Sequence, residues 1–425
     1  MRKNYLWYQF FRYGVMRPAL NLFYSDIQVT GRQYIPEHKP VLFVANHQNS
    51  FLDALHVVNN TKHFVHFLTR AEAFGNPVLD RFFYSLNMLP VYRARDGFGT
   101  IRRNNEIFSD CFDRLYQKDA VLVFAEASHE MVRRVRPLSK GFTRIVFGAE
   151  EKYNWELDLQ IVPVGINYGD HRKSQRPVHI KFGEAVPSVR YRDDFHEDER
   201  EAATKLKVDM AARLKELTLH VPNKQHYALY QLLLDELEPD RSILINPDKV
   251  NVRVSEIKQQ LNGELVDESQ QLLEKAEQHG ISIKELVNPP RANLKDLLLS
   301  PLYGFSLVNN ALPNLLVRWL VDSYLEDEAF ESSVKFLVGL LLPVYYLLIG
   351  SIFIIGGLSW PWTLGYIITS LITARLFVRA RDLLRSMVGE KKKRKQFLNG
   401  EGISEKLEKL RDIRKSLFGN TDQKS

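Results

Sequence analysis

The sequence predicts an α/β protein with a helical C-terminal half, on three observations. Between residues 27 and 182, short apolar runs typical of strands alternate with helical patterns, which favours a layered sheet. From about Arg190 the strand signals stop, and helical patterns separated by prolines follow. The segment from Phe336 to Ala374 contains no Asp, Glu, Lys, Arg or His. We therefore predict a central, mostly parallel or mixed sheet flanked by helices, with a helical annex and a C-terminal transmembrane helical hairpin.

The expected elements of the sheet region follow from apolar runs bounded by turn residues and from helical periodicity. A short, wholly apolar run such as Val41–Ala45 needs cover on both faces, as in a parallel sheet. The predicted strands are 27–29, 41–45, 63–68, 121–124, 161–166 and 178–182. The predicted helices between and after them are 51–59, 77–86, 99–117, 139–151 and 199–219.

The chain of 425 residues is long enough for several structural units. At the N-terminus, aromatic residues are mixed with Arg12 and Arg17, which suits a helix in a membrane interface or, equally, an amphipathic helix packed on the domain. The predicted units are an N-terminal membrane-interface helix (1–30), an α/β domain (31–190), a helical annex (191–295), an amphipathic or re-entrant segment (296–332), a transmembrane hairpin (333–380) and a basic cytoplasmic tail (381–425).

The uncharged segment predicts membrane insertion. At about 20 residues per crossing, roughly forty uncharged residues are enough for a hairpin of two helices; a re-entrant hairpin is the alternative. The residues that follow are basic, including Arg375 and the run Lys391–Lys395, so the positive-inside rule places this end in the cytoplasm. Two crossings return the chain to its starting side. We therefore expect an integral membrane protein with a cytoplasmic catalytic domain, whose basic run contacts membrane lipids rather than nucleic acid.

Composition limits the chemistry. Cys111 is the only cysteine, so the chain has no internal disulfide and no cysteine metal cluster. His63 and His66 are three apart in a strand-like run, which places them on opposite faces. The net charge of +7 is modest for this length and does not imply a nucleic-acid partner. We predict no metal site and no nucleic-acid binding.

The candidate catalytic pair is His47 with Asp53, in the polar stretch that follows the predicted strand 41–45. Six positions correspond to about 120° around a helix, so the loop must fold the imidazole back over the carboxylate. A carboxylate on one ring nitrogen fixes the tautomer and makes the other nitrogen a better base. Asn46, beside His47, is a candidate binding residue. Taken alone, the pair is also compatible with a polar loop and an incidental capping aspartate.

Three further blocks follow at spacings suited to one fold. Arg93 ends a hydrophobic run, and its planar guanidinium suits phosphate, although a lone arginine is usually a surface residue. The other two blocks are strands with polar or special residues near their ends. The remaining candidate binding residues from these blocks are Glu126, Ser128, His129, Lys140 and Pro163.

These blocks together resemble the glycerolipid acyltransferase superfamily, the glycerol-3-phosphate and 1-acylglycerol-3-phosphate acyltransferases, over about 27–187. Its members read Asn-His-x-x-x-x-Asp, a hydrophobic run ending in Arg, Phe-Pro-Glu-Gly-Thr-Arg, and Val-Pro-Val. The resemblance implies His47 as general base, Asp53 as its orienting carboxylate, and Arg93 and Glu126 as contacts of a glycerophosphate acceptor. It also implies that the Val-Pro block lines a pocket. No cofactor is implied beyond a co-substrate, the thioester of coenzyme A or acyl carrier protein.

The sequence departs from the family pattern in ways that leave the substrate open. Five residues, not four, separate His47 from Asp53, Ala125 and Ala127 replace the usual Pro and Gly, and His129 stands where Arg is common. We expect a membrane-bound O-acyltransferase of phospholipid biosynthesis. The alternatives are an acyltransferase for a non-phosphate or amine-bearing lipid acceptor, and a catalytically silent lipid-binding scaffold of the same fold.

Overall fold

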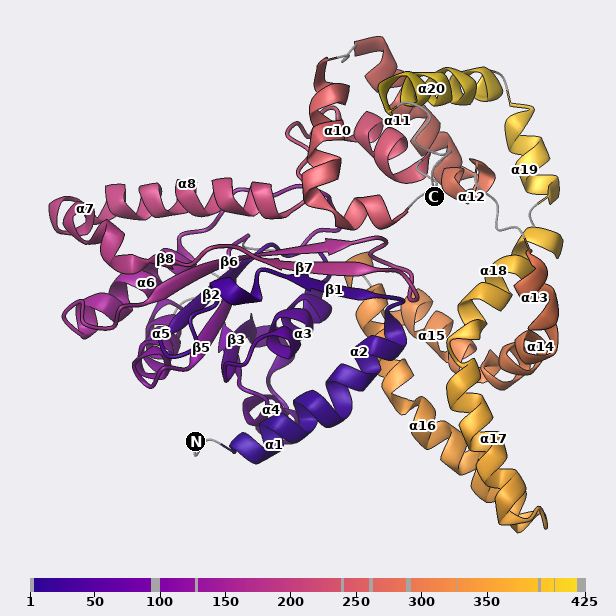
Figure 1. Cartoon of the computed structure of the whole chain (residues 1–425), viewed down its shortest axis with the longest axis horizontal. Helices are drawn as coiled ribbons and strands as arrows, with labels where there is room; N and C mark the ends of the chain where they lie inside the picture. The colour runs from indigo at the N-terminus through magenta and orange to yellow at the C-terminus, as the bar shows by residue number, and fades with distance from the viewer. Residues whose placement is uncertain are drawn as a thin grey trace. The chain divides into compact units, whose positions relative to one another are not determined.

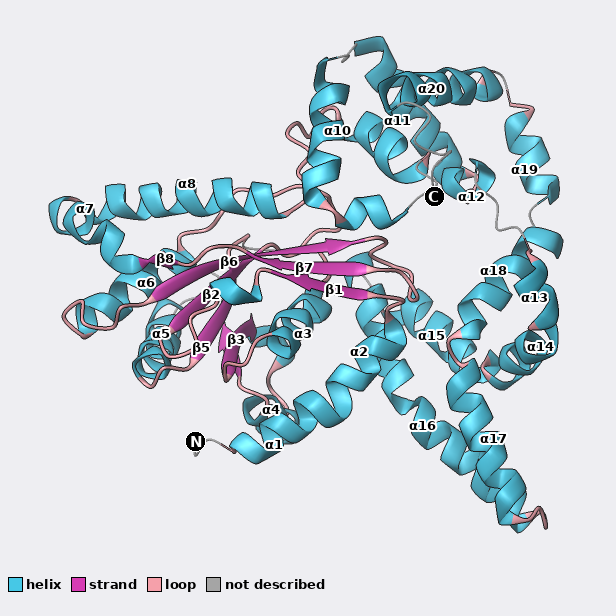
Figure 2. Cartoon of the chain, in the orientation of Figure 1, coloured by secondary structure: helices cyan, strands magenta, loops and turns pink. Residues whose placement is uncertain are grey.

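The computed structural model describes residues 4–92, 100–126, 129–237, 241–259, 263–287, 292–325, 327–388, 391–400 and 402–418. The chain forms two compact units (Figure 1). The α/β unit comprises Met1–Asn21, Asp26–His171 and Pro177–His220. The helical unit comprises Leu22–Ser25, Arg172–Arg176 and Val221–Ser425. The predicted mixed α/β fold is confirmed, and the strands lie in the α/β unit (Figure 2).

The sheet has eight strands in the order β1-β7-β6-β2-β5-β3-β4, with β8 paired to β6. All pairs are parallel except β6 with β7 and β6 with β8. The sheet is therefore mixed, with a parallel centre that needs cover on both faces. The strands are β1 (Ile27–Thr30), β2 (Val41–Ala45), β3 (Val65–Arg70), β4 (Met88–Val91), β5 (Ala120–Phe124), β6 (Gln160–Tyr168), β7 (Val178–Phe182) and β8 (Val186–Pro187).

Helices cover this sheet. They are α1 (Tyr5–Gln9), the π-helical segment η1 (Phe10–Met16), α2 (Arg17–Phe23), α3 (Ser50–Asn60), α4 (Pro77–Ser85), α5 (Thr100–Tyr116), α6 (Gly141–Lys152), α7 (Arg192–Glu197) and α8 (Glu199–Leu217). Short 3-10 turns are η2 (Arg32–Tyr34), η3 (Ala71–Ala73) and η5 (Ser188–Tyr191). The predicted strands and helices of this region are all present, whereas the strands β4 and β8, helix α7 and the 3-10 turns were not predicted.

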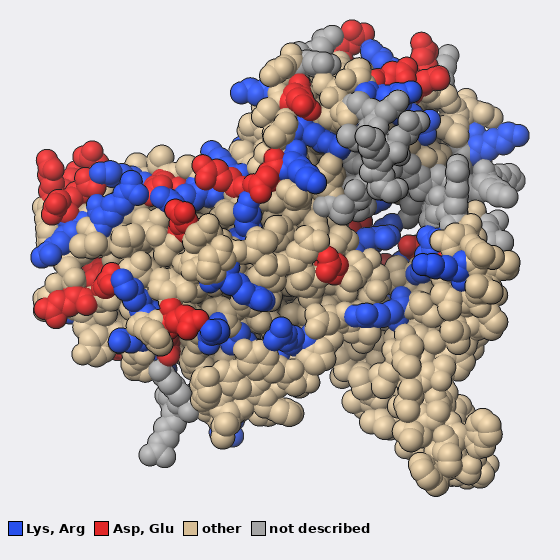
Figure 3. Space-filling model, viewed as in Figure 1, with Lys and Arg blue, Asp and Glu red and all other residues tan. Residues whose placement is uncertain are grey.

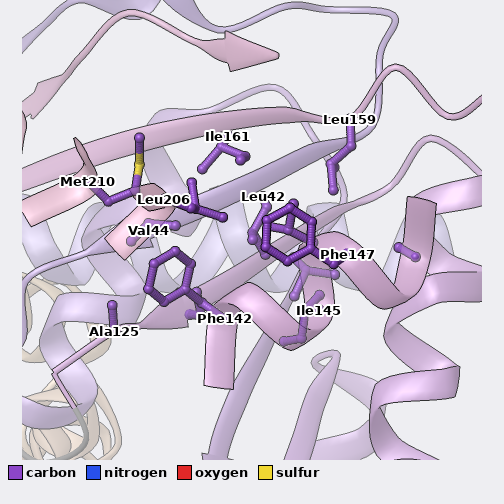
Figure 4. Packing of buried hydrophobic residues seen from close by; sticks show 14 of the residues in the cluster. Leu42, Val44, Ala125, Phe142, Ile145, Phe147, Leu159, Ile161, Leu206 and Met210 are labelled. Carbon is purple, nitrogen blue, oxygen red and sulfur yellow. The ribbon is translucent and has the colours of Figure 1, made fainter. Parts of the chain in front are cut away.

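Strand β2 is the centre of the core, because its five residues are fully buried. Alternate side chains of a strand point to opposite faces. Leu42 and Val44 join a cluster with Phe142 and Ile145 of α6 (Figure 4), whereas Phe43 packs against Phe182 of β7. Each such fully buried side chain contributes about 1.5–3 kcal/mol relative to an exposed one. The strand that carries the catalytic loop is thus firmly held from both faces.

The α/β unit extends beyond the predicted boundary at residue 190. Helix α8 places Ala202, Leu206, Met210 and Leu214 in the same cluster. Figure 4 shows Leu206 and Met210 among them. Its C-terminal end lies so close to β6 that a Cβ on Gly165 would be 2.2 Å from the Leu217 carbonyl oxygen. The α/β unit therefore includes α8, which we had assigned to the annex. The apolar side chains of α8 recur every four residues and form a stripe that is buried against the sheet.

The first helix of the helical unit after residue 221 is α9 (Tyr227–Gln231), which continues into the π-helical segment η6 (Leu232–Glu236). The 3-10 turn η7 (Arg241–Ile245) comes next in the sequence. The final helix α20 packs against α10, α11 and η6. The other elements are α10 (Pro247–Gln259), α11 (Gly263–Gln278), α12 (Ile283–Val287), α13 (Leu294–Leu298), α14 (Ser300–Asn309), α15 (Ala311–Tyr324), η8 (Glu328–Phe330), α16 (Glu331–Ile355), α17 (Trp360–Thr373), α18 (Leu376–Val388), α19 (Lys391–Leu398) and α20 (Ile403–Phe418).

Helices α16 and α17 pack side by side as a hairpin, and its surface in Figure 3 carries no charged side chains towards the tip. Within the described residues, one helix, Glu328–Ile355, is long and apolar enough to cross a membrane, with a mean hydropathy of 2.4 over a stretch of 18 residues. Helix α17 has 14 residues, about 21 Å, and passes the same test only together with Leu376–Ser386, at a bend of 65°. The second arm of the hairpin is therefore shorter than the predicted second crossing.

Candidate functional site

The parallel centre of the sheet brings the predicted motifs to one edge. Ala45, the last residue of β2, pairs with Phe124 of β5 and with Val164 of β6. The loops that follow β2 and β5 therefore start side by side at the carboxyl edge, where open α/β sheets place their ligands. His47 and Glu126 lie in these two loops, and Tyr168 ends β6 nearby.

The His47 imidazole is bonded to Asp53, in the arrangement that required the loop to fold back over the carboxylate. His47 Nδ1 lies 2.9 Å from Asp53 Oδ2. The chain reaches this geometry because the backbone turns at Ser50, whose φ is 45°, and folds the loop back over the first turn of α3. Since a carboxylate only accepts hydrogen bonds, Nδ1 carries the proton and Nε2 has a free lone pair. The ring is therefore in the tautomer that a general base requires.

Asp53 is fully buried and surrounded by donors. Its Oδ2 also accepts the backbone N–H groups of Gln48 (2.9 Å) and Asn49 (2.8 Å), and its Oδ1 accepts the Tyr168 hydroxyl at 2.6 Å. Burial alone would raise the pKa of Asp53, but the bonds from His47, Tyr168 and Asn49 outweigh burial and hold this pKa below its usual value. Asp53 is thus an anion that orients His47 and caps α3.

The imidazole is held by stacking as well as by hydrogen bonding. The Phe124 ring lies parallel to it, with centroids 4.0 Å apart and an interplanar angle of 12°. His129 approaches it edge-on, with centroids 5.4 Å apart. The His47 side chain nevertheless keeps 17% of its surface exposed, whereas Asp53 has none. A substrate can therefore reach His47 but not its carboxylate.

Glu126 braces the catalytic loop. Its Oε2 accepts the backbone N–H of His47 at 3.2 Å and the Arg136 Nη2 at 2.9 Å, and its Oε1 accepts the backbone N–H of Arg136. Arg136 Nη2 also lies 3.3 Å from the His47 carbonyl oxygen, so this ion pair holds both backbone polar groups of His47. Burial raises the pKa of Glu126, and the charge of Arg136 offsets only part of this rise.

The polar residues around His47 anchor the loop to β6 and to the residues after it. Asn46 exchanges two hydrogen bonds with the Ile166 backbone, at 2.8 and 3.1 Å, as a strand partner would. Gln48 accepts from His171 Nε2 at 3.0 Å, and Asn49 donates to the His171 carbonyl. The amide groups of this stretch therefore set the shape of the loop.

Two arginines near the site bond to other protein groups. Arg70, at the end of β3, places Nη2 3.1 Å from His129 Nδ1, which therefore accepts. Arg133 donates to the carbonyl oxygens of Tyr168 (2.6 Å) and Gly169 (3.4 Å). Both cations add positive charge at the carboxyl edge while fixing the surrounding loops.

The other predicted site residues lie in different surroundings. Lys140 is exposed at the start of α6. Pro163 is buried within β6 and paired with Val44, where it packs close to Gly183. Arg93 and Ser128 lie outside the described residues. The structure thus brings together His47, Asp53, Glu126, His129 and Asn46, and it places Pro163 in the strand interior.

Sequence reasoning did not identify Tyr168, Phe124, Arg70 or Arg136 as site residues. Each belongs to the end of a strand or to the loop after it, so the rule that strand ends meet at one edge was the signal available for them. No three His, Cys, Asp or Glu side chains are grouped as metal ligands within the described ranges.

Comparison with known proteins points to one family. Residues 26–167 match the family model described as Acyltransferase. Among solved structures, the chain is similar to the crystal structure of the 1-acyl-sn-glycerophosphate (LPA) acyltransferase PlsC from Thermotoga maritima. That match has a TM-score of 0.36 and 19% identity, and it covers 51% of this chain and 84% of the other. The search of curated proteins finds no match.

Proposed function

Because residues 26–167 form an acyltransferase-family domain, we propose that the chain is a membrane-bound O-acyltransferase that moves an acyl group from a thioester to a hydroxyl of a glycerophosphate acceptor. The observation that carries the proposal is the His47–Asp53 pair at the carboxyl edge of the sheet, with Nδ1 bonded to the carboxylate at 2.9 Å. The donor would be a thioester of coenzyme A or of acyl carrier protein. The acceptor would be glycerol-3-phosphate or its 1-acyl form.

The proposed reaction uses His47 as both base and acid. Nε2 takes the proton of the acceptor hydroxyl while its oxygen attacks the thioester carbonyl carbon. An ester C–O bond forms, the C–S bond breaks, and the leaving thiolate receives the proton from the imidazolium. Asp53, buried beside the ring, stabilises the positive charge that His47 carries between the two steps.

The membrane attachment is part of the same proposal. The apolar helix Glu328–Ile355 and the bent pair that follows it support insertion of the hairpin. A hairpin that crosses fully and one that re-enters both return the chain to its starting side. Because the flank after the hairpin is basic, with Arg375 and Arg385 followed by Lys391–Lys395, we place this side and the catalytic domain in the cytoplasm.

The experiment is a thiol-release assay on the purified full chain with an acyl-CoA donor. Glycerol-3-phosphate, its 1-acyl form and dihydroxyacetone phosphate are supplied in parallel, and the products are identified by mass spectrometry. Thiol should appear only when an acceptor is present, and His47→Gln should abolish it. His38→Gln, at an exposed position, is the matched control. Full transfer by His47→Gln would contradict the mechanism.

One observation favours a second candidate, an acceptor without a phosphate. Arg70, Arg133 and Arg136 around the site all bond to other protein groups, namely His129, the end of β6 and Glu126. A phosphate would have to compete with these partners or depend on Lys140 and Arg93. The same acceptor panel, extended with a monoacylglycerol and an amino alcohol, distinguishes the two, because a non-phosphate acceptor would then give the fastest thiol release.

A further inference from the structure

A pocket of about 400 Å³ lies at the opposite, amino edge of the sheet, between the N-terminal helical segment and the end of α3. A neighbouring pocket of about 310 Å³ shares Arg17, Arg32, Asn59 and Asn60 with it. We call the larger one the three-arginine pocket, after Arg12, Arg17 and Arg32 in its wall. Its lining also contains Lys62 and one acid, Glu37, and these two side chains already form an ion pair at 2.6 Å.

The π-helical turn η1 places two of the arginines on one face. The backbone N–H of Arg17 bonds to the carbonyl of Arg12, five residues earlier, so the two side chains follow each other along the helix. In an α-helix the same spacing would separate them by about 140°. Their guanidinium carbons lie 4.7 and 5.8 Å from the centre of the Tyr13 ring, which lines the same pocket.

Arg12 is a buried cation with spare donor capacity. It is 3% exposed, and it donates through Nη1 to the His63 carbonyl at 3.4 Å. Its Nε has no hydrogen-bond partner, and Arg12 takes part in none of the ion pairs seen among the described residues. A buried charge normally requires a partner of opposite sign, because removing it from water is costly. The pocket in front of Arg12 is where such a partner would fit.

The third arginine is fixed beside the other two. Arg32 donates to the carbonyl oxygen of Asn60 at 3.1 Å and to its side-chain oxygen at 2.7 Å. Burial lowers the pKa of Arg32, and the positive charges of Arg17 and Arg12 lower it further. The negative end of the α3 dipole stabilises one positive charge near Asn60. It is too weak to offset the mutual repulsion of three arginines gathered there.

We propose that the three-arginine pocket binds a phosphate group, carried either by the headgroup of an anionic lipid or by a soluble phosphate. Guanidinium groups present paired N–H donors that match phosphate oxygens. The site is distinct from the catalytic one, because α3 runs from Ser50 at the catalytic loop to Asn60 at the pocket, 11 residues or about 16 Å. The proposal does not depend on the acyl-transfer proposal.

The test is arginine-specific labelling of the full chain in neutral detergent with phenylglyoxal, read residue by residue by mass spectrometry. Arg200, exposed on α8, is the internal reference. One arm adds inorganic phosphate, a second adds phosphatidic acid to the micelles, and a third adds chloride at the same ionic strength. We expect Arg17 and Arg32 to be labelled several-fold more slowly in the phosphate arm, the lipid arm or both, with Arg200 unchanged.

The pattern of protection identifies the source of the phosphate. Protection by inorganic phosphate supports a soluble ligand, and protection by phosphatidic acid alone supports a lipid headgroup. Protection by chloride to the same extent, equal protection of Arg200, or no protection in either arm would overturn the proposal.

Substitutions provide a second, independent measurement. Arg17→Gln and Arg32→Gln change exposed positions, so both variants should fold. Each should lower the affinity for the protecting ligand about tenfold. Arg200→Gln should leave that affinity unchanged. If the double variant of Arg17 and Arg32 binds phosphate and phosphatidic acid as tightly as the unchanged chain does, measured by equilibrium dialysis and by co-sedimentation, the site does not exist.

Discussion

Among the described residues of the α/β unit, two histidines pair with a buried carboxylate, at opposite edges of the same sheet. His47 and Asp53 lie 2.9 Å apart at the carboxyl edge, and His66 Nε2 lies 3.1 Å from Asp119 Oδ2 at the amino end of β3 and β5. The first histidine keeps 17% of its side chain exposed, whereas the second keeps 3%. Matching pair distances therefore do not identify a catalytic site. Access to the ring, and the groups that orient the carboxylate, separate the two.

The largest expected difference follows from neutralising each carboxylate in turn. Asp53→Asn should lower the rate of thiol release by roughly 10³- to 10⁴-fold, because an amide does not fix the required tautomer or stabilise the imidazolium. Asp119→Asn should leave the rate unchanged and cost about 1.5–3 kcal/mol of stability, since it weakens a charge-assisted bond. Thiol release and thermal unfolding of both variants in one detergent provide the comparison. A similar loss of activity in both would end the distinction between the pairs.

The ion pair of Glu126 and Arg136, which holds the backbone of His47, gives the next largest effect. Arg136→Met leaves Glu126 buried without its cation, and breaking a buried ion pair in this way costs about 3–5 kcal/mol. We expect a lower unfolding temperature together with a slower rate, since the Arg136 guanidinium also contacts the His47 carbonyl. The double variant Glu126→Gln with Arg136→Met should recover part of the stability. No recovery would show that the two side chains act separately.

A further buried histidine, His56, sharpens the comparison, because burial is the largest influence on the pKa of its ring. Burial lowers the pKa of His56, next to Asp53 on α3, from 6.5 to about 4. The folded state then binds fewer protons than the unfolded state between these values. The free energy of unfolding should therefore fall by about 3 kcal/mol as the pH drops from 6.5 to 4. His56→Leu should flatten this dependence in thermal unfolding, and His38→Gln should not. An unchanged slope in His56→Leu would assign the acid sensitivity to other groups.

The smallest effect concerns the outer donor to Asp53. Tyr168→Phe removes the 2.6 Å bond to Oδ1 and leaves the three donors on Oδ2 in place. We expect roughly a tenfold slower rate, corresponding to about 1.4 kcal/mol, with little change in the Michaelis constant of the acceptor. The measurement is a comparison of kcat and KM for the two proteins. A change confined to KM would instead place Tyr168 in contact with the acceptor.

Much of the fold could be predicted from local sequence. Val41–Ala45 and Val178–Phe182 agree with the observed strands residue for residue, because continuous apolar runs between turn signals have few other interpretations. Strand β4 was missed, since it is four residues long and contains Pro90. The extent of the α/β unit was also missed. The apolar stripe of α8 is visible in the sequence, but its partner β6 lies about fifty residues earlier.

The candidate site also has a part that local sequence predicts and a part that it does not. The His47–Asp53 bond spans six residues and could be predicted from spacing and chemistry together. The contacts that complete the site span far greater distances, as with Tyr168 to Asp53 over 115 residues and Asn46 to Ile166 over 120. No periodicity encodes such separations. They follow only from the strand order, which places β6 beside β2.

The flat contact between Phe124 and His47 restricts how the proposed reaction can proceed. With one face of the imidazole covered and Nδ1 held by Asp53, the ring cannot swing between two positions during a turnover. The nitrogen that collects a proton must also return it from the same place. Alcohol and departing sulfur would therefore have to meet at a single point in space, and the position of that point depends in part on a side chain that takes no part in the bond changes.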